Sequence, residues 1–359
     1  MAKRFLIWYW SPTGAGGSQY AVKLAQRLAR RFGDSAVTLS LHAEDPSIAK
    51  AAAFGFETLA ASVVTARRLP LRTAANLAAS ARVLEEHARN ADCVIIPMNF
   101  AAAAPLAMTL HKPIVYVAHD PTPHPGDYAP LLQRATQAAL LRKSARVLAL
   151  SNYTAQDLVK SAGVRGKVHM APLSAVYEPH EPAPRAEGPV RLLFAGRMIA
   201  YKGVDVLAEA LPALAHRDDW RLTIAGSGPA LDAAAAARFA LPQIERVTRD
   251  WLSEAQLEAL IAECDIVLAP YRSATQSGLL AQALAHGKPC VVTRVGALGE
   301  QIGDGAAGWV AERADAGAFA AAVETALERP EEARAKAQAA HALARAAWEH
   351  DYWRWLEEL

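Results

Sequence analysis

Short apolar runs alternate with longer segments of helical periodicity along the whole chain. Residues 190–195 form one such run, interrupted only by Arg191, which is typical of a strand buried in a parallel sheet. Residues 20–31 show the other pattern, with apolar residues between Ala21 and Leu28 on one face of a predicted helix. Strands are likewise predicted at residues 5–10, 36–41, 92–97, 113–118, 145–150, 168–173, 220–225, 265–271 and 290–293. Helices are predicted at residues 73–89, 204–214, 253 onward, 316–327 and 330–348, and the segment 272–287 runs into a helix that ends at Gly287. This alternation predicts an α/β fold with parallel sheets.

The chain length of 359 residues leaves room for two domains. A segment with four prolines and several polar residues, residues 179–189, has the composition of a linker. We therefore expect an N-terminal Rossmann-like domain over residues 1–178 and a C-terminal one over residues 190–340. The aromatic-rich end of the chain, residues 341–359, follows as a separate C-terminal helix.

Composition narrows the class of protein. The chain is 52% hydrophobic and 21% charged, and no apolar run reaches the roughly 18 residues of a membrane span. No secretory signal precedes the first strand, and Cys93, Cys264 and Cys290 lie in or beside apolar runs without paired spacing. These features indicate a cytoplasmic protein with buried, reduced thiols.

Charge is distributed unevenly between the two halves. Residues 1–185 carry 21 Lys and Arg against 12 Asp and Glu, a net +9, and the remaining residues carry a net −7. A basic N-terminal half could receive an anionic acceptor or contact the inner face of a membrane, although uneven surface charge can also be without consequence. The basic residues are not interleaved with aromatic ones in any nucleic-acid-binding module, so nucleic acid is not an expected partner.

Two permanent cations follow the predicted strand 190–195. Gly196 ends the strand, and Arg197 and Lys202 lie five residues apart on the loop that enters the next helix. Cations at the carboxyl end of a strand, beside the positive end of a helix, form an anion site. Such a site could stabilise a diphosphate leaving group. The alternative is an ordinary solvated loop.

A second polar group follows the strand at residues 113–118. His119, Asp120, His124 and Asp127 lie on a loop stiffened by prolines, where open α/β sheets bind ligands. A metal site is one alternative, but the spacing matches no familiar ligand pattern. A loop whose polar groups satisfy one another is the other alternative.

The sequence Gly196-Arg197-x-x-x-x-Lys202-Gly203 resembles the signature of glycosyltransferase family 4, the retaining sugar-nucleotide transferases of the GT-B fold. The resemblance extends over nearly the whole chain. It implies two Rossmann-like domains facing a central cleft, with the C-terminal helix crossing back to the N-terminal domain. It also implies that Arg197 and Lys202 bind the donor's phosphates.

The resemblance assigns roles to further residues. His119 would lie beside the reacting sugar, and Asp120 and His124 in the acceptor region. The donor-binding residues that it implies are Gly16, Gly17, Gly196, Gly226, Arg249, Asp250, Trp251, Leu252, Gln276, Ser277, Gly278, Leu279 and Gln282. Residues 249–252 would contact the base, and the amides of Ser277, Gly278 and Leu279 would face an anion. Most members have two glutamates, eight residues apart, where this chain has Ala274 and Gln282. The resemblance implies that the first glutamate touches the sugar, which alanine cannot do, and that the second binds the ribose hydroxyls, which glutamine can still do.

The resemblance implies transfer of a hexose-type sugar from a nucleotide-diphosphate donor to a hydroxyl of a saccharide or lipid-linked acceptor, with retention. No Asp-x-Asp occurs in the chain, so we expect no metal and no further cofactor. Two alternatives remain: a non-catalytic nucleotide-sugar-binding protein, and a nucleotide-sugar epimerase. A nicotinamide dehydrogenase is disfavoured because neither half has the dinucleotide-binding glycine pattern with its acidic partner.

Overall fold

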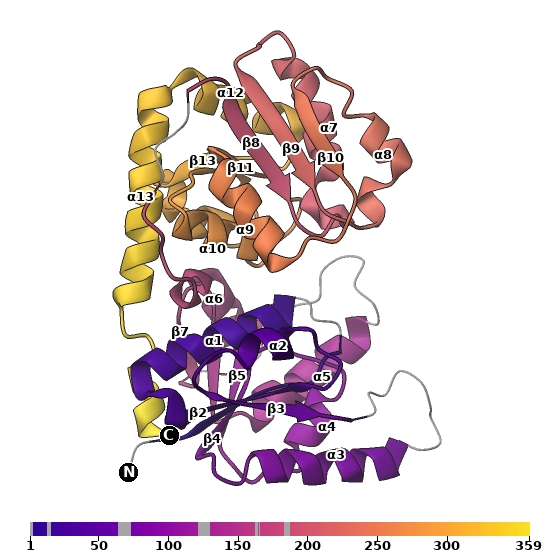
Figure 1. The fold of residues 1–359 in the computed structure, drawn as a ribbon, viewed down its shortest axis with the longest axis vertical. Helices are drawn as coiled ribbons and strands as arrows, with labels where there is room; N and C mark the ends of the chain where they lie inside the picture. Colours follow the sequence, from indigo (N-terminus) through magenta and orange to yellow (C-terminus); the bar gives the residue numbers. More distant parts are fainter. Residues whose placement is uncertain are drawn as a thin grey trace. The chain divides into compact units, whose positions relative to one another are not determined.

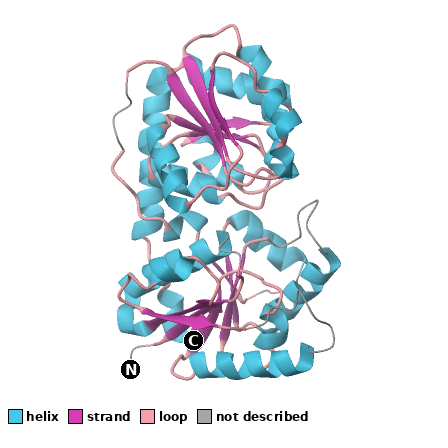
Figure 2. Cartoon of the chain, turned by 45° about the vertical axis from the view of Figure 1, so that its right-hand side comes forward, coloured by secondary structure: helices cyan, strands magenta, loops and turns pink. Residues whose placement is uncertain are grey.

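The computed structural model describes residues 3–12, 16–63, 73–120, 130–161, 164, 166–182 and 187–359. The described residues divide into two units. The first runs to Ala171 and includes Asp351–Leu359, and the second is Pro172–His350. Each unit is a parallel sheet with helices on both faces (Figure 1, Figure 2). The α/β fold class with two Rossmann-like sheets is therefore confirmed.

The first unit has seven strands in the order β3-β2-β1-β4-β5-β6-β7. Its strands are β1 Phe5–Tyr9, β2 Val37–His42, β3 Glu57–Ala61, β4 Cys93–Ile96, β5 Ile114–Ala118, β6 Arg146–Ala149 and β7 Val168–Met170. Its helices are α1 Gly16–Phe32, α2 Ser47–Ala51, α3 Thr73–His87, α4 Ala103–Ala107, α5 Pro130–Lys143 and α6 Asn152–Ser161. The strand order changes direction between β1 and β4, so the loops after these two strands flank the switch point.

The second unit has six strands in the order β10-β9-β8-β11-β12-β13. Its strands are β8 Val190–Ala195, β9 Trp220–Ala225, β10 Ile244–Thr248, β11 Ile266–Ala269, β12 Cys290–Thr293 and β13 Gly308–Ala311. Its helices are α7 Val204–Ala210, α8 Ala233–Ala237, α9 Glu254–Glu263, α10 Gly278–Ala285, α11 Leu298–Gln301, α12 Ala316–Glu328 and α13 Pro330–Glu349. Here the switch point lies between β8 and β11.

Apolar runs determine which strands occupy the middle of each sheet. Every residue of β1 and β11 is buried, whereas β3 and β10 are edge strands with several exposed or half-exposed residues. The sequence pattern predicted the interior strands and the edge strand β7, and it missed three edge strands, β3, β10 and β13. For β3 and β10 the reason is that an edge strand does not have to bury both faces.

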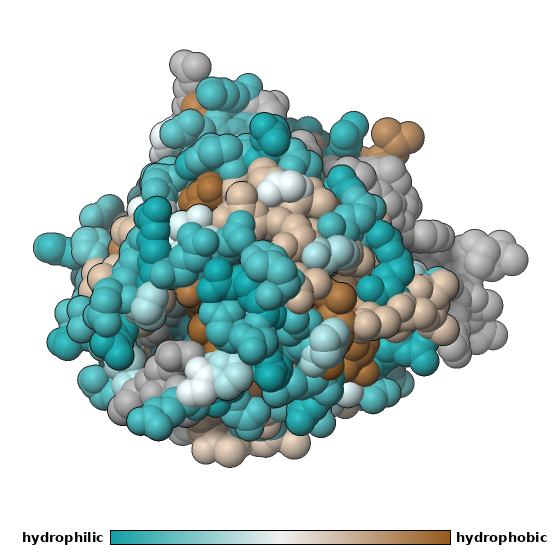
Figure 3. Space-filling model, turned by 90° about the horizontal axis from the view of Figure 1, so that it is seen from above, coloured by the Kyte–Doolittle hydropathy of each residue, from teal (hydrophilic) through white to brown (hydrophobic). Residues whose placement is uncertain are grey.

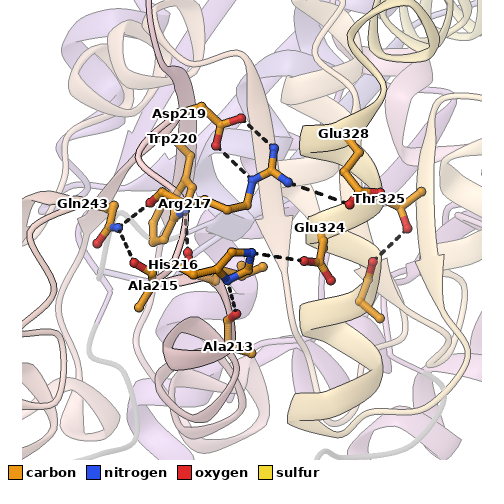
Figure 4. Close-up of polar contacts among 12 residues, drawn as sticks. Ala213, Ala215, His216, Arg217, Asp219, Trp220, Gln243, Glu324, Thr325 and Glu328 are labelled. Atoms are coloured by element: carbon orange, nitrogen blue, oxygen red, sulfur yellow. Dashed lines mark hydrogen bonds and ion pairs between the residues drawn. The ribbon is translucent and has the colours of Figure 1, made fainter.

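The loop that precedes β9 is held by side-chain contacts (Figure 4). Arg217 donates two hydrogen bonds to Asp219, at 3.0 and 2.6 Å, and lies 3.8 Å from Glu328 of α12. The buried Gln243 donates to the carbonyl oxygens of Ala215 and Arg217, at 3.1 and 2.6 Å. These contacts fix the start of β9 at the end of the sheet opposite the switch-point loops.

The last nine residues pack within the first unit. Arg31 of α1 forms ion pairs with Asp351 at 2.8 Å and Glu357 at 2.7 Å, and the ring of His169 stacks on Trp355 at 4.0 Å. The sequence placed the returning segment at residues 341–359. In the structure residues up to Glu349 belong to α13 of the second unit, and the units divide at Ala171 and Pro172, not at 178.

The surface is mainly polar on the face that Figure 3 displays, with apolar residues in small groups between hydrophilic ones. None of the helices in the described part of the chain combines the length and the hydropathy that a membrane span requires. All three cysteines are free and buried, and burial raises the pKa of both Cys93 and Cys264 to about 12. They are therefore protonated, unreactive thiols at neutral pH.

Candidate functional site

The strongest candidate site lies at the switch point of the second sheet. The loop after β8 carries Arg197 and Lys202, and the loop after β11 runs from Pro270 to Ser277. Because β8 and β11 are adjacent and parallel, the two loops emerge at the same edge of the sheet. The sequence prediction that polar groups gather at this edge agrees with the topology.

Lys202 is held in place by Tyr271. Lys202 ends a short 3-10 turn, Ala200–Lys202, and its Nζ donates to the Tyr271 hydroxyl at 2.7 Å. The next residue, Gly203, has a φ of 72°, and a Cβ there would lie 1.9 Å from the carbonyl oxygen of Pro270. The turn therefore packs backbone against backbone on the end of β11, which fixes the origin of the lysine side chain.

Tyr271 links the lysine to the start of α10. The residue is fully buried, and burial raises the pKa of its phenol to about 12, so the hydroxyl is neutral at pH 7. Its oxygen lies 3.3 Å from Oγ of Ser277, which caps α10 by accepting the Leu280 N–H at 3.4 Å. A cation and a helix N-terminus thus share one network, and both attract negative charge.

The amide of Ser277 is not available to a ligand. It donates to Oε1 of Gln301 at 2.7 Å, and Nε2 of Gln301 donates back to the Ser277 carbonyl at 3.2 Å. The prediction that Ser277, Gly278 and Leu279 all direct N–H groups at an anion is wrong for Ser277. Gly278 and Leu279 are the first two helical residues, whose N–H groups have no acceptor within the helix.

Arg197 is an exposed cation beside this network. Among the residues that the structure describes, its side chain has no hydrogen-bond or ion-pair partner. Its positive charge acts on Tyr271, where it opposes the rise of the phenol pKa that burial causes. The following residue, Met198, is fully buried and anchors the loop by donating its N–H to the Ser227 carbonyl at 2.8 Å. A fixed backbone thus carries a guanidinium that remains available to an anion.

Gly196 and Gly226 bring the loops after β8 and β9 into contact. The N–H of Gly196 donates to Ala225, and a Cβ on Gly226, whose φ is 143°, would lie 1.8 Å from the Gly196 carbonyl oxygen. Packing therefore explains the glycine at 226, whereas Gly196 has open space around it and is favoured by its φ of 117°. Their predicted role in donor binding stays a prediction.

The segment predicted to contact the base joins β10 to α9. Asp250, Trp251 and Leu252 line a pocket of about 250 Å³ between these elements, and Trp251 is 56% exposed. Arg249 is exposed but does not line it. Ser253 starts α9 through a capping box with Gln256, as its position in the sequence predicted. The pocket has an aromatic side chain and polar groups, a composition suited to a planar heterocycle.

Gln282 lies on α10, and Ala274 and Gln276 lie on the loop that enters this helix. Gln282 is half-buried and hydrogen-bonded to the hydroxyl of Tyr177, whose pKa is raised by burial. Gln276 is half-buried on the loop that enters the helix. Ala274, where the resemblance implies a glutamate, is only 7% exposed, and its carbonyl oxygen would be 1.5 Å from a Cβ on Gly296. The loops after β11 and β12 therefore touch through backbone atoms at this position.

His119 follows β5 in the first unit. It is buried, its ring meets that of Tyr20 edge-on at 4.6 Å, and burial lowers its pKa to about 4. The imidazole is neutral at pH 7, so it can donate or accept a hydrogen bond but supplies no charge. The backbone carbonyl of the neighbouring Asp120 accepts from Gln137 at 2.7 Å. His124 lies outside the described residues.

Gly16 and Gly17 are the first residues of α1. A Cβ on Gly17 would lie 2.3 Å from the hydroxyl oxygen of Tyr9, whereas Gly16 has open space around it. The next residue, Ser18, donates its hydroxyl to Asp45. Packing against Tyr9 thus explains Gly17, and the predicted contact of both glycines with the donor stays a prediction.

Sequence reasoning missed Tyr271, Gln301 and Tyr177. Each is fixed by contacts with residues far away in the chain, so no local motif marks them. Tyr271 gave one signal, since a tyrosine directly after the buried run 266–270 stands at the edge where ligands bind.

Comparisons with known proteins identify the family of the chain. The family profile described as Glycosyltransferase Family 4 matches residues 14–173, and the profile described as Glycosyl transferases group 1 matches residues 189–329. A glycogen synthase of Mycobacterium tuberculosis is 33% identical over 160 residues, which are 43% of this chain and 37% of that protein. A GDP-mannose-dependent phosphatidylinositol monomannoside mannosyltransferase of Mycolicibacterium smegmatis is 34% identical over 170 residues, 44% of this chain and 43% of that protein. The chain thus matches less than half the length of either relative.

Solved structures share the fold over almost the entire chain. The Anabaena protein HepE in complex with UDP-glucose has a TM-score of 0.74 at 17% identity, covering 99% of this chain and 100% of that one. A glycosyltransferase of Rickettsia africae has a TM-score of 0.73 at 16% identity, covering 98% and 96%. Two family profiles match successive parts of the chain, and its fold is that of solved glycosyltransferases. The chain therefore belongs to glycosyltransferase family 4, among the glycosyltransferases of the GT-B fold.

Proposed function

We propose that this glycosyltransferase transfers a hexose-type sugar from a nucleotide-diphosphate donor to a hydroxyl of a saccharide or lipid-linked saccharide, with retention of configuration. Lys202 and Arg197 stabilise the nucleoside diphosphate as it departs. Gly278 and Leu279 add backbone N–H groups at the start of α10, and the neutral His119 orients the sugar. Gln282 bonds the ribose hydroxyls, because an amide can both donate and accept.

One observation carries the proposal. The ammonium of Lys202 and the N-terminus of α10 are joined through Tyr271 and Ser277, over 2.7 and 3.3 Å. When the bond to the sugar breaks, negative charge accumulates on the diphosphate, and a prearranged cation and helix end stabilise that charge without reorganising. This is the interaction that a transferase needs in the transition state more than in the ground state.

The donor's chemistry follows from the same groups. The loop after β8 supplies two permanent positive charges, and the sequence has no Asp-x-Asp. We therefore propose that the transfer requires no divalent metal at the diphosphate. The mannosyltransferase and the UDP-glucose complex found by comparison support a nucleotide sugar as donor. The pocket beside Trp251 suits the base.

The experiment has two stages. Thermal-shift screening against UDP-, GDP- and ADP-sugars identifies the donor, because only a bound donor stabilises the folded state. Transfer is then followed as release of the matching nucleoside diphosphate, with EDTA present and absent. Lys202→Ala is expected to lower the transfer rate by several orders of magnitude while the fold is retained.

Lys336→Ala is the matched control. Lys336 is also a partly buried lysine, with Nζ 5.2 Å from the centre of the Trp309 ring, but it lies on α13. The Lys336→Ala protein should be less stable than the wild type and should keep the wild-type transfer rate. Near-normal turnover by Lys202→Ala would remove the central assignment, and loss of activity in EDTA would refute metal independence.

The buried Ala274 supports a second candidate, a non-catalytic nucleotide-sugar-binding protein. Alanine offers no polar atom to the sugar where most members have a carboxylate. The same screen separates the two candidates, since this one requires donor binding without transfer or hydrolysis. An epimerase would instead convert the donor sugar with no acceptor present, which chromatography of the nucleotide sugars would reveal.

A further inference from the structure

Three potential metal ligands gather on the second unit, away from the cation network. His180, Glu258 and His286 each offer one ligand atom, and these atoms all lie within 4.8 Å of one another. Nε2 of His180 is 3.7 Å from Oε1 of Glu258, and Nε2 of His286 is 3.8 Å from the same oxygen. The three residues come from separate elements: the segment after the 3-10 turn Leu173–Val176, helix α9 and the end of helix α10.

The backbone holds both histidines in position. His286 is the C-cap residue of α10, and its N–H donates to Gln282 and Ala283. The N–H of His180 donates to the carbonyl of Ala285, the last residue of the same helix, at 2.7 Å. The two rings therefore lie face to face, with centres 4.3 Å apart and planes 20° apart. One helix end thus positions two of the three ligands.

The contacts of Glu258 with the two histidines are not hydrogen bonds. Separations of 3.7 and 3.8 Å are longer than a hydrogen bond between nitrogen and oxygen. A divalent cation accounts for the convergence of these three side chains, because it binds imidazole nitrogens and a carboxylate together.

The distances are close to those of a metal site. Zinc lies about 2.0–2.1 Å from imidazole nitrogen and about 2.0–2.2 Å from carboxylate oxygen, so tetrahedral ligands are roughly 3.4 Å apart. A few tenths of an ångström of movement would bring the observed pairs to this spacing. His180 and Glu258 have side chains 50% and 46% exposed, so both can adjust without disturbing the core.

We propose that His180, Glu258 and His286 bind one divalent cation of the zinc class, with water in the remaining position. Two imidazoles and one carboxylate are ligands that zinc accepts in three-residue sites. The ion would tie the segment that enters the second unit to α9 and α10. Helix α10 has eight residues, about 12 Å of rise, so the ion sits at the end opposite the Ser277 cap. The site is independent of the proposed metal-free transfer.

The test uses the full chain without a histidine tag, stripped with EDTA and dialysed. Zinc chloride is titrated by calorimetry, and Co²⁺ is titrated in parallel because tetrahedral Co²⁺ absorbs visible light. The wild type should bind one ion per chain, and zinc should raise its Tm. His180→Ala and Glu258→Gln should each weaken binding by at least about 10- to 100-fold, since a direct ligand matters at least as much as an outer partner.

His216 provides the matched control. It forms a similar surface pair with Glu324, also at 3.7 Å, and belongs to no described cluster of three potential metal ligands. His216→Ala should bind zinc as the wild type does. The proposal is overturned if the wild type shows no saturable binding of one ion, or if His180→Ala binds zinc unchanged. Both variants alter exposed side chains, so a folding defect does not obscure the result, and no readout depends on sugar transfer.

Discussion

Replacing Tyr271 with phenylalanine removes one hydroxyl from the candidate site and leaves the buried ring in place. That hydroxyl accepts the hydrogen bond from Lys202 at 2.7 Å and lies 3.3 Å from Ser277 Oγ. A hydrogen bond to a charged group contributes about 1.5–3 kcal/mol. If the whole contribution positions the ammonium for the departing diphosphate, the transfer rate should fall about 10- to 150-fold, since each 1.36 kcal/mol is tenfold.

The assay is the initial rate of nucleoside diphosphate release at saturating donor, with Lys202→Ala measured in parallel. Tyr271→Phe should lie between the wild type and Lys202→Ala, because the charge remains and only its position loosens. Thr293→Val is the control, since Thr293 donates to the backbone carbonyl of Tyr271 and makes no contact with the lysine. It should lower Tm and keep the turnover.

Two results would refute the reasoning. A folded Tyr271→Phe protein with the wild-type rate would show that the hydroxyl does not position Lys202 for transfer. Activity as low as that of Lys202→Ala would show that Tyr271 acts in some way other than through the lysine.

Three further predictions concern stability. Gln243→Leu removes two part-buried hydrogen bonds (Figure 4) and should lower the free energy of unfolding by about 1–3 kcal/mol in urea titrations; an unchanged midpoint would contradict this. Gly226→Ala places a Cβ 1.8 Å from the Gly196 carbonyl oxygen at a φ of 143°, so it should cost about 3 kcal/mol or more, and a wild-type Tm would count against the packing described here. Burial lowers the pKa of His119 from 6.5 to about 4, so below pH 6.5 the unfolded state binds the proton first, and stability should fall by about 2 kcal/mol between pH 7 and pH 5. His119→Gln should lack this loss, and equal pH dependence of the two proteins would exclude the histidine as its source.

Local sequence patterns were sufficient to predict elements whose residues all have a similar environment. The runs at 190–195 and 220–225 coincide with β8 and β9 because strands covered on both faces are mostly apolar. The start of α9 at Ser253 was predictable for a similar reason, since a cap and its N3 partner lie within four residues of sequence.

Contacts between distant residues could not be predicted in this way. Lys202 and Tyr271 are 69 positions apart, and Ser277 and Gln301 are 24 apart. The first contact requires β8 and β11 to be neighbours, which depends on strand order and not on any local motif. The second explains the wrong prediction for the Ser277 amide: helix geometry leaves that N–H unpaired, and only the fold brings Gln301 to it.

The same loop contacts separate recognition of the diphosphate from recognition of the sugar. Gly203 packs on the carbonyl of Pro270, and Gly296 packs on the carbonyl of Ala274, so backbone atoms set the position of both loops. A side chain at position 274 contributes nothing to these contacts. The alanine can therefore replace the family's glutamate without moving Lys202, whose position depends on the loop backbone and Tyr271. Under the proposed function, the phosphate-binding charges would then persist in a chain whose sugar contacts differ, and position 274 would determine which sugar is transferred and not whether a diphosphate can leave.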